Sequence, residues 1–266
     1  MKIYDAHTHI FPRKIAQKAT QAIGDFYDIP MNEIGSAEIL LQSGAKIGVE
    51  KYLVCSSATK PSQVRAINEF ISQACKEHDA FIGFGTLHPY MDRDAVEQEL
   101  SYIKECGLRG IKLHPDFQLF HIDEKQAIPM YEKIAAAGLP VLFHTGDARY
   151  DYSSPKRLRN VIKEVPSLVA IAAHFGGYQE WDIVEECLSH GNIYFDTSSS
   201  LFTLDKKAAV NMIRHLGVER FMFGTDFPMW DHMKELKRFL DLPLNEDEQA
   251  QILYKTFERL FKIEEK

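Results

Sequence analysis

The sequence predicts an α/β protein, a single (β/α)8 TIM barrel that spans residues 1–266, and three observations support this class. Eight short apolar or β-branched segments recur along the chain, and a longer stretch with helical spacing follows each of them. From the third segment onward their starts are about 25–32 residues apart, the length of one strand–helix unit. The chain length of 266 residues also suits a barrel, which typically needs about 250 residues.

The predicted strands are residues 2–9, 51–57, 81–87, 108–114, 140–144, 168–174, 192–198 and 220–226. The runs at 141–143 and 169–172 are apolar throughout. Parallel strands that are buried on both faces have this pattern, whereas half-exposed antiparallel strands alternate. Eight such strands separated by helices predict a closed parallel barrel.

Helix boundaries are predicted from residues that favour the ends of helices. The expected helix starts lie near Asp92, Asp123, Pro155 and Asp205. The first two of these helices are expected to stop at Gly107 and Gly138, because glycine readily adopts the left-handed conformation that ends many helices.

An extended loop is predicted after the first strand. Residues 10–50 separate the first two strands, which is longer than a plain crossover requires. In a barrel this loop emerges on the face that carries the active site, so we expect it either to cap the site or to act as a structural plug.

The composition excludes several classes of protein. The formal net charge is −7, and the lysines and arginines form no basic stripe, so no nucleic-acid partner is expected. There is neither a leader-like segment nor a long apolar run, and the four cysteines form no CxxC pair. We therefore expect a cytoplasmic protein with reduced thiols, away from membranes, and aromatic residues on the outer helices hint at a homodimer.

A pair of histidines, His7 and His9, ends the first predicted strand. Side chains alternate along a strand, so these two imidazoles point to the same side, toward the barrel axis. Two imidazoles on one face can share a divalent metal ion.

Three further polar residues end other strands. His144 ends the fifth strand, His174 the sixth and Asp226 the eighth. Barrel enzymes assemble their catalytic residues at these carboxyl ends. Because each buried polar group needs a partner, so many histidines and a carboxylate on one rim predict a metal centre.

The motifs around these residues resemble a known family. They are Asp-Ala-His-Thr-His-Ile-Phe-Pro at 5–12, His-Thr-Gly at 144–146, Ala-His-Phe-Gly-Gly at 173–177 and Gly-Thr-Asp-Phe-Pro at 224–228. Together they resemble the amidohydrolase-related metal-dependent hydrolases, in the branch that includes aminocarboxymuconate-semialdehyde decarboxylase. The resemblance implies one divalent ion, usually zinc with manganese as the alternative, bound by His7, His9, His144 and Asp226.

The resemblance also implies catalytic roles for two residues. Asp226 accepts a proton from a metal-activated water and later delivers it to a leaving group. His174 approaches the water or the substrate; the alternative is a structural residue that supports the ligands.

The fourth strand and two loops offer weaker candidates. Lys112 and His114 share one face of that strand. Lys112 either bridges a second metal or pairs with a carboxylate inside the barrel, and His114 either binds substrate or makes a structural hydrogen bond. Arg149 either clamps a substrate carboxylate or forms a surface salt bridge. Asp196 and residues 198–200 either position substrate or cap a helix.

Three functions follow from this site. The leading hypothesis is hydrolysis of a small-molecule ester, lactone or amide by a metal-activated water. The alternative is a metal-dependent non-oxidative decarboxylase, a carboxy-lyase acting on an aromatic or enoic acid. The second alternative is an inactive barrel that serves as a binding module.

Overall fold

Strands and helices alternate along the chain in the computed structural model, which describes residues 1–263. The predicted domain runs to residue 266, so its last three residues lie outside the described part. The chain divides into two compact units, which are considered one at a time. The first comprises residues 1–54, 78–81 and those from 196 onward, and the second comprises residues 55–77 and 82–195.

The first unit contains the two ends of the described chain. Its elements are β1 (Ile3–His9), α1 (Ala16–Tyr27), α2 (Ala37–Ala45), β2 (Val49–Cys55), α9 (Lys206–Leu216), the 3-10 turn η4 (Val218–Arg220), β9 (Phe221–Met222), α10 (His232–Leu240), α11 (Glu246–Ala250), the π-helical turn η5 (Gln251–Lys255) and α12 (Thr256–Phe261).

Strand β1 lies at the centre of this unit. It neighbours β2 on one side, where Thr8 Oγ1 donates to the carbonyl of Leu53 at 2.7 Å. On its other side the segment after β9 pairs with it, because Ala6 N–H donates to the Phe223 carbonyl at 2.8 Å. The pairing continues as a parallel bridge between Thr8 and Phe227. Residues 7–9 and 224–227 are therefore held side by side.

The second unit carries most of the remaining strands. Its elements are η1 (Pro61–Gln63), α3 (Val64–Glu77), β3 (Phe81–Gly83), β4 (Gly85–Thr86), α4 (Arg93–Glu105), β5 (Ile111–Leu113), α5 (Pro115–Gln118), α6 (Ile128–Ala136), β6 (Val141–Phe143), α7 (Pro155–Glu164), β7 (Ala170–Ala172), η2 (His174–Gly176), η3 (Trp181–Ile183), α8 (Val184–Leu188) and β8 (Ile193–Asp196).

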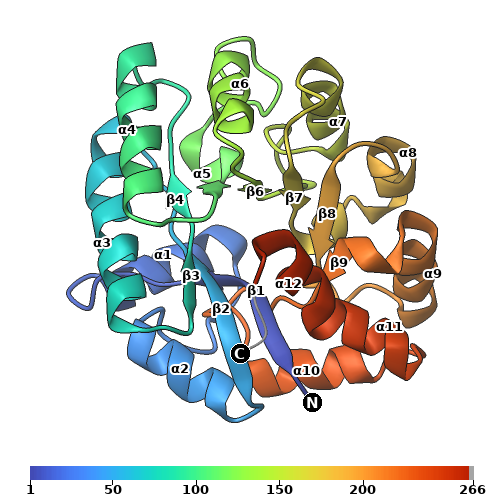
Figure 1. Ribbon diagram of the computed structural model, residues 1–266. Helices are drawn as coiled ribbons and strands as arrows, with labels where there is room; N and C mark the ends of the chain where they lie inside the picture. The colour runs from blue at the N-terminus through green and yellow to red at the C-terminus, as the bar shows by residue number, and fades with distance from the viewer. Residues whose placement is uncertain (264–266) are drawn as a thin grey trace. The chain divides into compact units, whose positions relative to one another are not determined.

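The strands β4 to β8 of the second unit pair in parallel, each with the next in sequence. Their register brings the strand ends level, since Leu113 lies beside Phe143 and Phe143 lies beside Ala172. Every residue of β5, β6 and β7 is buried, as expected for parallel strands covered on both faces. Figure 1 shows the helices of this unit outside its strands.

Each predicted strand segment overlaps a strand of the structure, and the third contains two strands, β3 and β4. Gly83 and Gly85 flank the break between them. No Cβ fits at Gly83, where it would lie 2.6 Å from Cys75 Sγ. Glycine permits this close approach of α3, and it also weakens a strand, which explains the interruption.

Both predicted helix stops and three of the four predicted helix starts are confirmed. Helix α4 ends at Glu105, and Gly107 follows with φ of +74°, while Asp205 caps α9 by accepting from two backbone N–H groups. The helix expected near Asp123 instead begins at Ile128. The Asp123 carboxylate binds Arg157 and Asn160 of α7, so it is not available to cap α6.

The segment at 10–50 is largely helical, because it contains both α1 and α2. Its turn lies against the segment that follows Asp226. Asn32 Nδ2 donates to the Met229 carbonyl at 2.7 Å, and Glu33 N–H donates to the Pro228 carbonyl at 3.2 Å. The insertion therefore supports one of the predicted metal ligands from within the same unit.

Two further findings concern the cysteines and the length of the helices. The four cysteines are free thiols, in agreement with the predicted reduced state. Across residues 1–263 no helix has the length and apolar character needed to cross a membrane.

Candidate metal centre

The two histidines of β1 face the Asp226 carboxylate within the first unit. His9 Nε2 lies 3.2 Å from Asp226 Oδ1, and His7 Nε2 lies 3.6 Å from the same oxygen. The two Nε2 atoms are 3.1 Å apart. Strand alternation predicts this convergence of His7 and His9, and the parallel bridge of residue 8 to residue 227 brings Asp226 beside them.

The orientation of Asp226 is set by its backbone and by Ser199. Asp226 adopts φ of +58°, in the left-handed region, and its N–H donates to the His7 carbonyl at 2.8 Å. The Ser199 hydroxyl donates to Asp226 Oδ2 at 2.6 Å and accepts from Trp230 Nε1 at 3.0 Å. Because Oδ2 is held in this way, Oδ1 is the oxygen directed to the two histidines.

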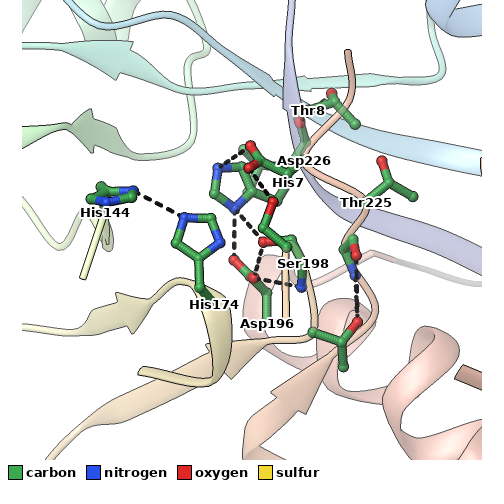
Figure 2. Close-up of polar contacts among 12 residues, drawn as sticks. His7, Thr8, His144, His174, Asp196, Ser198, Thr225 and Asp226 are labelled. Carbon is green, nitrogen blue, oxygen red and sulfur yellow. Dashed lines mark hydrogen bonds and ion pairs between the residues drawn. The ribbon is translucent and has the colours of Figure 1, made fainter. Parts of the chain in front are cut away.

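The other ring nitrogen of His7 is held by a carboxylate. His7 Nδ1 lies 2.9 Å from Asp196 Oδ2 and 3.1 Å from Ser198 Oγ (Figure 2). Ser198 also donates its N–H to Asp196 Oδ1 at 3.0 Å. An ionised Asp196 requires the proton of His7 to be on Nδ1, so the lone pair of Nε2 faces Asp226 and His9. Histidines that bind metals are commonly oriented by a carboxylate in this way.

A second buried carboxylate, Asp5, ties β1 to the segment after β9. Asp5 Oδ1 accepts the N–H groups of His7 at 3.0 Å and Thr225 at 3.1 Å, and Oδ2 accepts from Thr225 Oγ1 at 2.6 Å. His232 Nε2 lies 3.0 Å from Oδ2, and His232 Nδ1 lies 2.9 Å from Ser43 Oγ. The backbones that carry His7 and Asp226 therefore share one anchor.

In the second unit, His144 and His174 contact each other. His174 Nε2 lies 3.0 Å from His144 Nδ1, and both side chains are buried (Figure 2). His174 and Phe175 both adopt positive φ, at 61° and 55°. Trp181 Nε1 donates to the His174 carbonyl at 3.0 Å, which supports this unusual turn.

At the end of β5, the imidazole of His114 is stacked between two rings. Its ring centroid lies 3.7 Å from that of Phe117 and 4.0 Å from that of His144, and the angles between the ring planes are 9° and 7°. Asp116 follows two residues later, in the first turn of α5, and is almost completely buried. Burial raises the pKa of Asp116 to about 7, and the charge of Asp147 adds to this shift.

The two basic candidates occupy different environments. Lys112 is completely buried in β5. Its two predicted roles, as a bridge to a second metal and as a partner of a carboxylate inside the barrel, stay predictions. Arg149 forms a two-point ion pair with Asp147, Nε at 2.9 Å from Oδ1 and Nη2 at 2.7 Å from Oδ2. The guanidinium is thus engaged as in the salt-bridge alternative, although its partner is buried and not on the surface.

Several residues of the centre were missing from the sequence prediction or were weak in it. Asp5 is the first residue of the motif at 5–12 but was given no role, and neither was His232. Asp196, Ser198 and Ser199 were considered only for positioning substrate or capping a helix. The signal for Asp196 is its place at the end of the seventh predicted strand, the same position that identified His144 and His174.

The donor set of the first unit fits a divalent ion. One ligand atom each from His7, His9 and Asp226 lies within 4.8 Å of the others. Imidazole nitrogens and a carboxylate oxygen are ligands that zinc and manganese both accept. The orientation of His7 by Asp196 and of Asp226 by Ser199 is the support that such ligands usually have.

Comparison with known proteins gives a family and a fold. A family model described as "Amidohydrolase" matches residues 4–263. A 2,6-dihydroxybenzoate decarboxylase, solved with 2,6-dihydroxybenzoate, superimposes with a TM-score of 0.78 at 17% identity, covering 99% of this chain and 100% of that one. Among curated proteins, none is similar enough in sequence to count as a match.

Two further structures are similar over almost the whole chain. An uncharacterised TIM-barrel protein from Bordetella bronchiseptica has a TM-score of 0.76 at 21% identity, covering 98% of this chain and 99% of that one. A dihydroxybenzoic acid decarboxylase from Polaromonas, with bound manganese and the inhibitor 2-nitroresorcinol, has a TM-score of 0.76 at 15% identity, covering 98% and 97%. These matches confirm the (β/α)8 barrel that the sequence predicts.

Proposed function

This chain belongs to the amidohydrolase family, and we propose that it is a metal-dependent decarboxylase acting on a small aromatic or enoic acid. The observation that carries the proposal is the cluster of His7, His9 and Asp226, whose ligand atoms lie within 4.8 Å of one another. The similarity of the chain to two decarboxylases of dihydroxybenzoates supports decarboxylation over the hydrolysis that the sequence motifs favoured.

We propose one divalent ion, bound by His7, His9, His144 and Asp226. The motif order of the family supports His144 as the fourth ligand. Zinc and manganese both suit these ligands, and the manganese in the Polaromonas enzyme supports the second. A bound ion would act as a Lewis acid that attracts the substrate oxygens and offsets their negative charge.

The protein residues have separate tasks in the proposed reaction. The bond between the substrate carboxylate and its carbon breaks, the electron pair stays on that carbon, and carbon dioxide leaves. The carbon then takes a proton, which Asp226 accepts from solvent and delivers in our proposal. Ser199 holds Asp226 Oδ2 at 2.6 Å, so the carboxylate keeps one orientation throughout. His174 orients the substrate.

Product analysis tests the proposal. The protein is loaded with manganese or zinc and incubated with a panel of hydroxybenzoates, enoic acids and lactones, and both carbon dioxide and the organic product are measured. We expect carbon dioxide in equal amount to the decarboxylated product, turnover by Asp226→Asn about 10²- to 10⁴-fold lower than that of the wild type, and no turnover after chelation. Ring opening of a lactone without carbon dioxide release would restore the hydrolase hypothesis and contradict this one.

A further inference from the structure

The Asp116 carboxylate is buried without a hydrogen-bond donor in the described part of the chain. Its residue is 2% exposed, and neither Oδ1 nor Oδ2 has a hydrogen-bond partner. Buried polar groups in proteins are almost always hydrogen-bonded, because a carboxylate that loses water without a replacement donor is strongly disfavoured. A group that is not part of the chain is therefore expected to supply the donor.

The neighbouring side chains do not supply a well-placed donor. The Ser153 hydroxyl faces Asp116 and acts to lower its pKa, but the buried Ser153 Oγ makes no hydrogen bond of normal geometry. His144 Nε2 lies 3.8 Å from Asp116 Oδ2, which is too long for a hydrogen bond. The Arg149 guanidinium donates to both oxygens of Asp147 and acts on the pKa of Asp116 through its charge.

A metal ion does not fit this place. His114, Asp116 and His144 each offer a ligand atom within 4.8 Å of the others. However, the two imidazoles are stacked at 4.0 Å with an angle of only 7° between their planes. The lone pairs of an imidazole lie in the plane of its ring, so stacked rings direct them side by side and cannot converge on one ion.

We propose that Asp116 binds a hydroxyl group of the substrate, an inference that rests on the proposed decarboxylase function. Asp116 follows β5 at its carboxyl end, where barrel enzymes bind substrate, and it lies beside His144, a proposed metal ligand. A hydroxyl donates to a carboxylate, whereas the carboxylate of a substrate is repelled by it. Asp116 therefore selects hydroxy-substituted acids and orients them with the reacting carboxylate directed away from it.

Two matched probes test this assignment by binding alone. The first is 2-nitroresorcinol, which carries two hydroxyls and no carboxylate, and the second is 1,3-difluoro-2-nitrobenzene, in which fluorine cannot donate. Affinities are measured by calorimetry on the manganese-loaded protein, for the wild type, Asp116→Ala and Asp116→Asn. The control is Asp94→Asn, an exposed aspartate in the first turn of α4 as Asp116 is in the first turn of α5.

We expect Asp116→Ala to bind 2-nitroresorcinol about 10- to 100-fold more weakly, the loss of one hydrogen bond to a charged group, with little change for the difluoro probe. Asp94→Asn should bind both probes as the wild type does. Asp116→Asn keeps the shape of the side chain and should show a smaller loss in the same direction. If Asp116→Ala does not fold, Asp116→Asn replaces it in the test, after its folding and metal content have been compared with those of the wild type.

Three results would overturn the assignment. They are an equal loss for both probes, an unchanged affinity for 2-nitroresorcinol, and no binding of 2-nitroresorcinol to the wild type. An unchanged affinity would mean that Asp116 holds only buried water. If Asp116 controls the preference for the hydroxylated probe but no acid releases carbon dioxide, the subsite stands and the proposed function falls.

Discussion

The buried carboxylates of the two units differ in the hydrogen bonds that they accept. In the first unit, Asp5, Asp196 and Asp226 all accept hydrogen bonds from neighbouring residues. In the second unit, Asp147 is paired with Arg149, but Asp116 accepts none. All five are largely or completely buried, so the difference is not one of exposure.

The difference indicates which part of the site is complete without a ligand. A carboxylate that already holds its donors is fixed in one orientation, as a metal ligand or its support needs to be. A buried carboxylate that lacks donors is costly until something binds to it. We therefore propose that the fixed His7 and Asp226 bind the metal together with His9 and His144, and that Asp116 recognises a hydroxyl group.

The largest expected effect is on turnover when Asp226 becomes neutral. Asp226→Asn keeps the size of the side chain and an oxygen for the metal but cannot carry the proton. Turnover should fall by about 10²- to 10⁴-fold, the usual contribution of general acid–base catalysis. Steady-state kinetics on the metal-loaded protein measures this. Activity close to that of the wild type would remove Asp226 from the reaction.

The next effect is on stability when the anchor of the first unit is broken. Asp5→Asn cannot accept with both oxygens from His7 and Thr225, as the carboxylate does. The free energy of unfolding should fall by about 3–5 kcal/mol, because hydrogen bonds to a buried charged group are lost. Chemical denaturation checks this value against Asp25→Asn, an exposed control in α1. A loss as small as that of the control would mean that Asp5 does not anchor this unit.

A smaller effect is expected at Ser199, which we regard as a positioning residue for Asp226. Ser199→Ala removes the 2.6 Å hydrogen bond to Asp226 Oδ2. We expect kcat to fall about 10-fold with KM and metal content nearly unchanged, since one hydrogen bond to a charged group is lost.

Ser200→Ala is the matched control for Ser199, because that buried hydroxyl donates to a backbone carbonyl and not to Asp226. Equal losses of kcat in the two variants would show a general packing effect. Such a result would not support positioning of Asp226 by Ser199.

The last prediction concerns how stability depends on pH, and here the wild type, not the variant, loses stability. The pKa of Asp116 is raised from 3.8 to about 7 by burial, so the folded state retains a proton that the unfolded state releases. The stabilisation from that proton is lost progressively as the pH rises from about 4 to about 7. Asp116→Asn does not titrate, so in metal-free protein the wild type should lose stability relative to it between about pH 4 and pH 7.

Thermal unfolding of the two proteins across this range makes the measurement. A difference that stays constant with pH would show that Asp116 has its donors after all, and the contrast between the two units would disappear.

The sequence predicted the parts of this structure that depend on residue type and local order. Strand alternation identified His7 and His9 as a pair, and the strand ends identified His144, His174 and Asp226. Asp147 was also within reach of the sequence, since it lies two residues before Arg149. An acidic residue so close to an arginine indicates a local ion pair as readily as a substrate clamp.

Other parts depend on tertiary placement and could not be predicted from one sequence. Ser199 and Asp226 are 27 positions apart, and His7 and Asp196 are 189 apart. No local pattern links such residues, because the fold alone brings their side chains together. The lack of a hydrogen-bond donor for Asp116 could not be predicted from the sequence either, because it depends on which side chains the fold places around the carboxylate.

The central claim is a metal centre built on His7, His9, His144 and Asp226, and elemental analysis of the purified protein tests it most directly. Metal is measured before chelation, after chelation and after reloading, in the wild type and in His7→Ala. We predict about one zinc or manganese per chain in the wild type, with His7→Ala retaining little of it. Two ions per chain would favour Lys112 as a bridge to a second metal. A folded wild type that binds no metal, or a His7→Ala protein that binds as much as the wild type, would contradict the account.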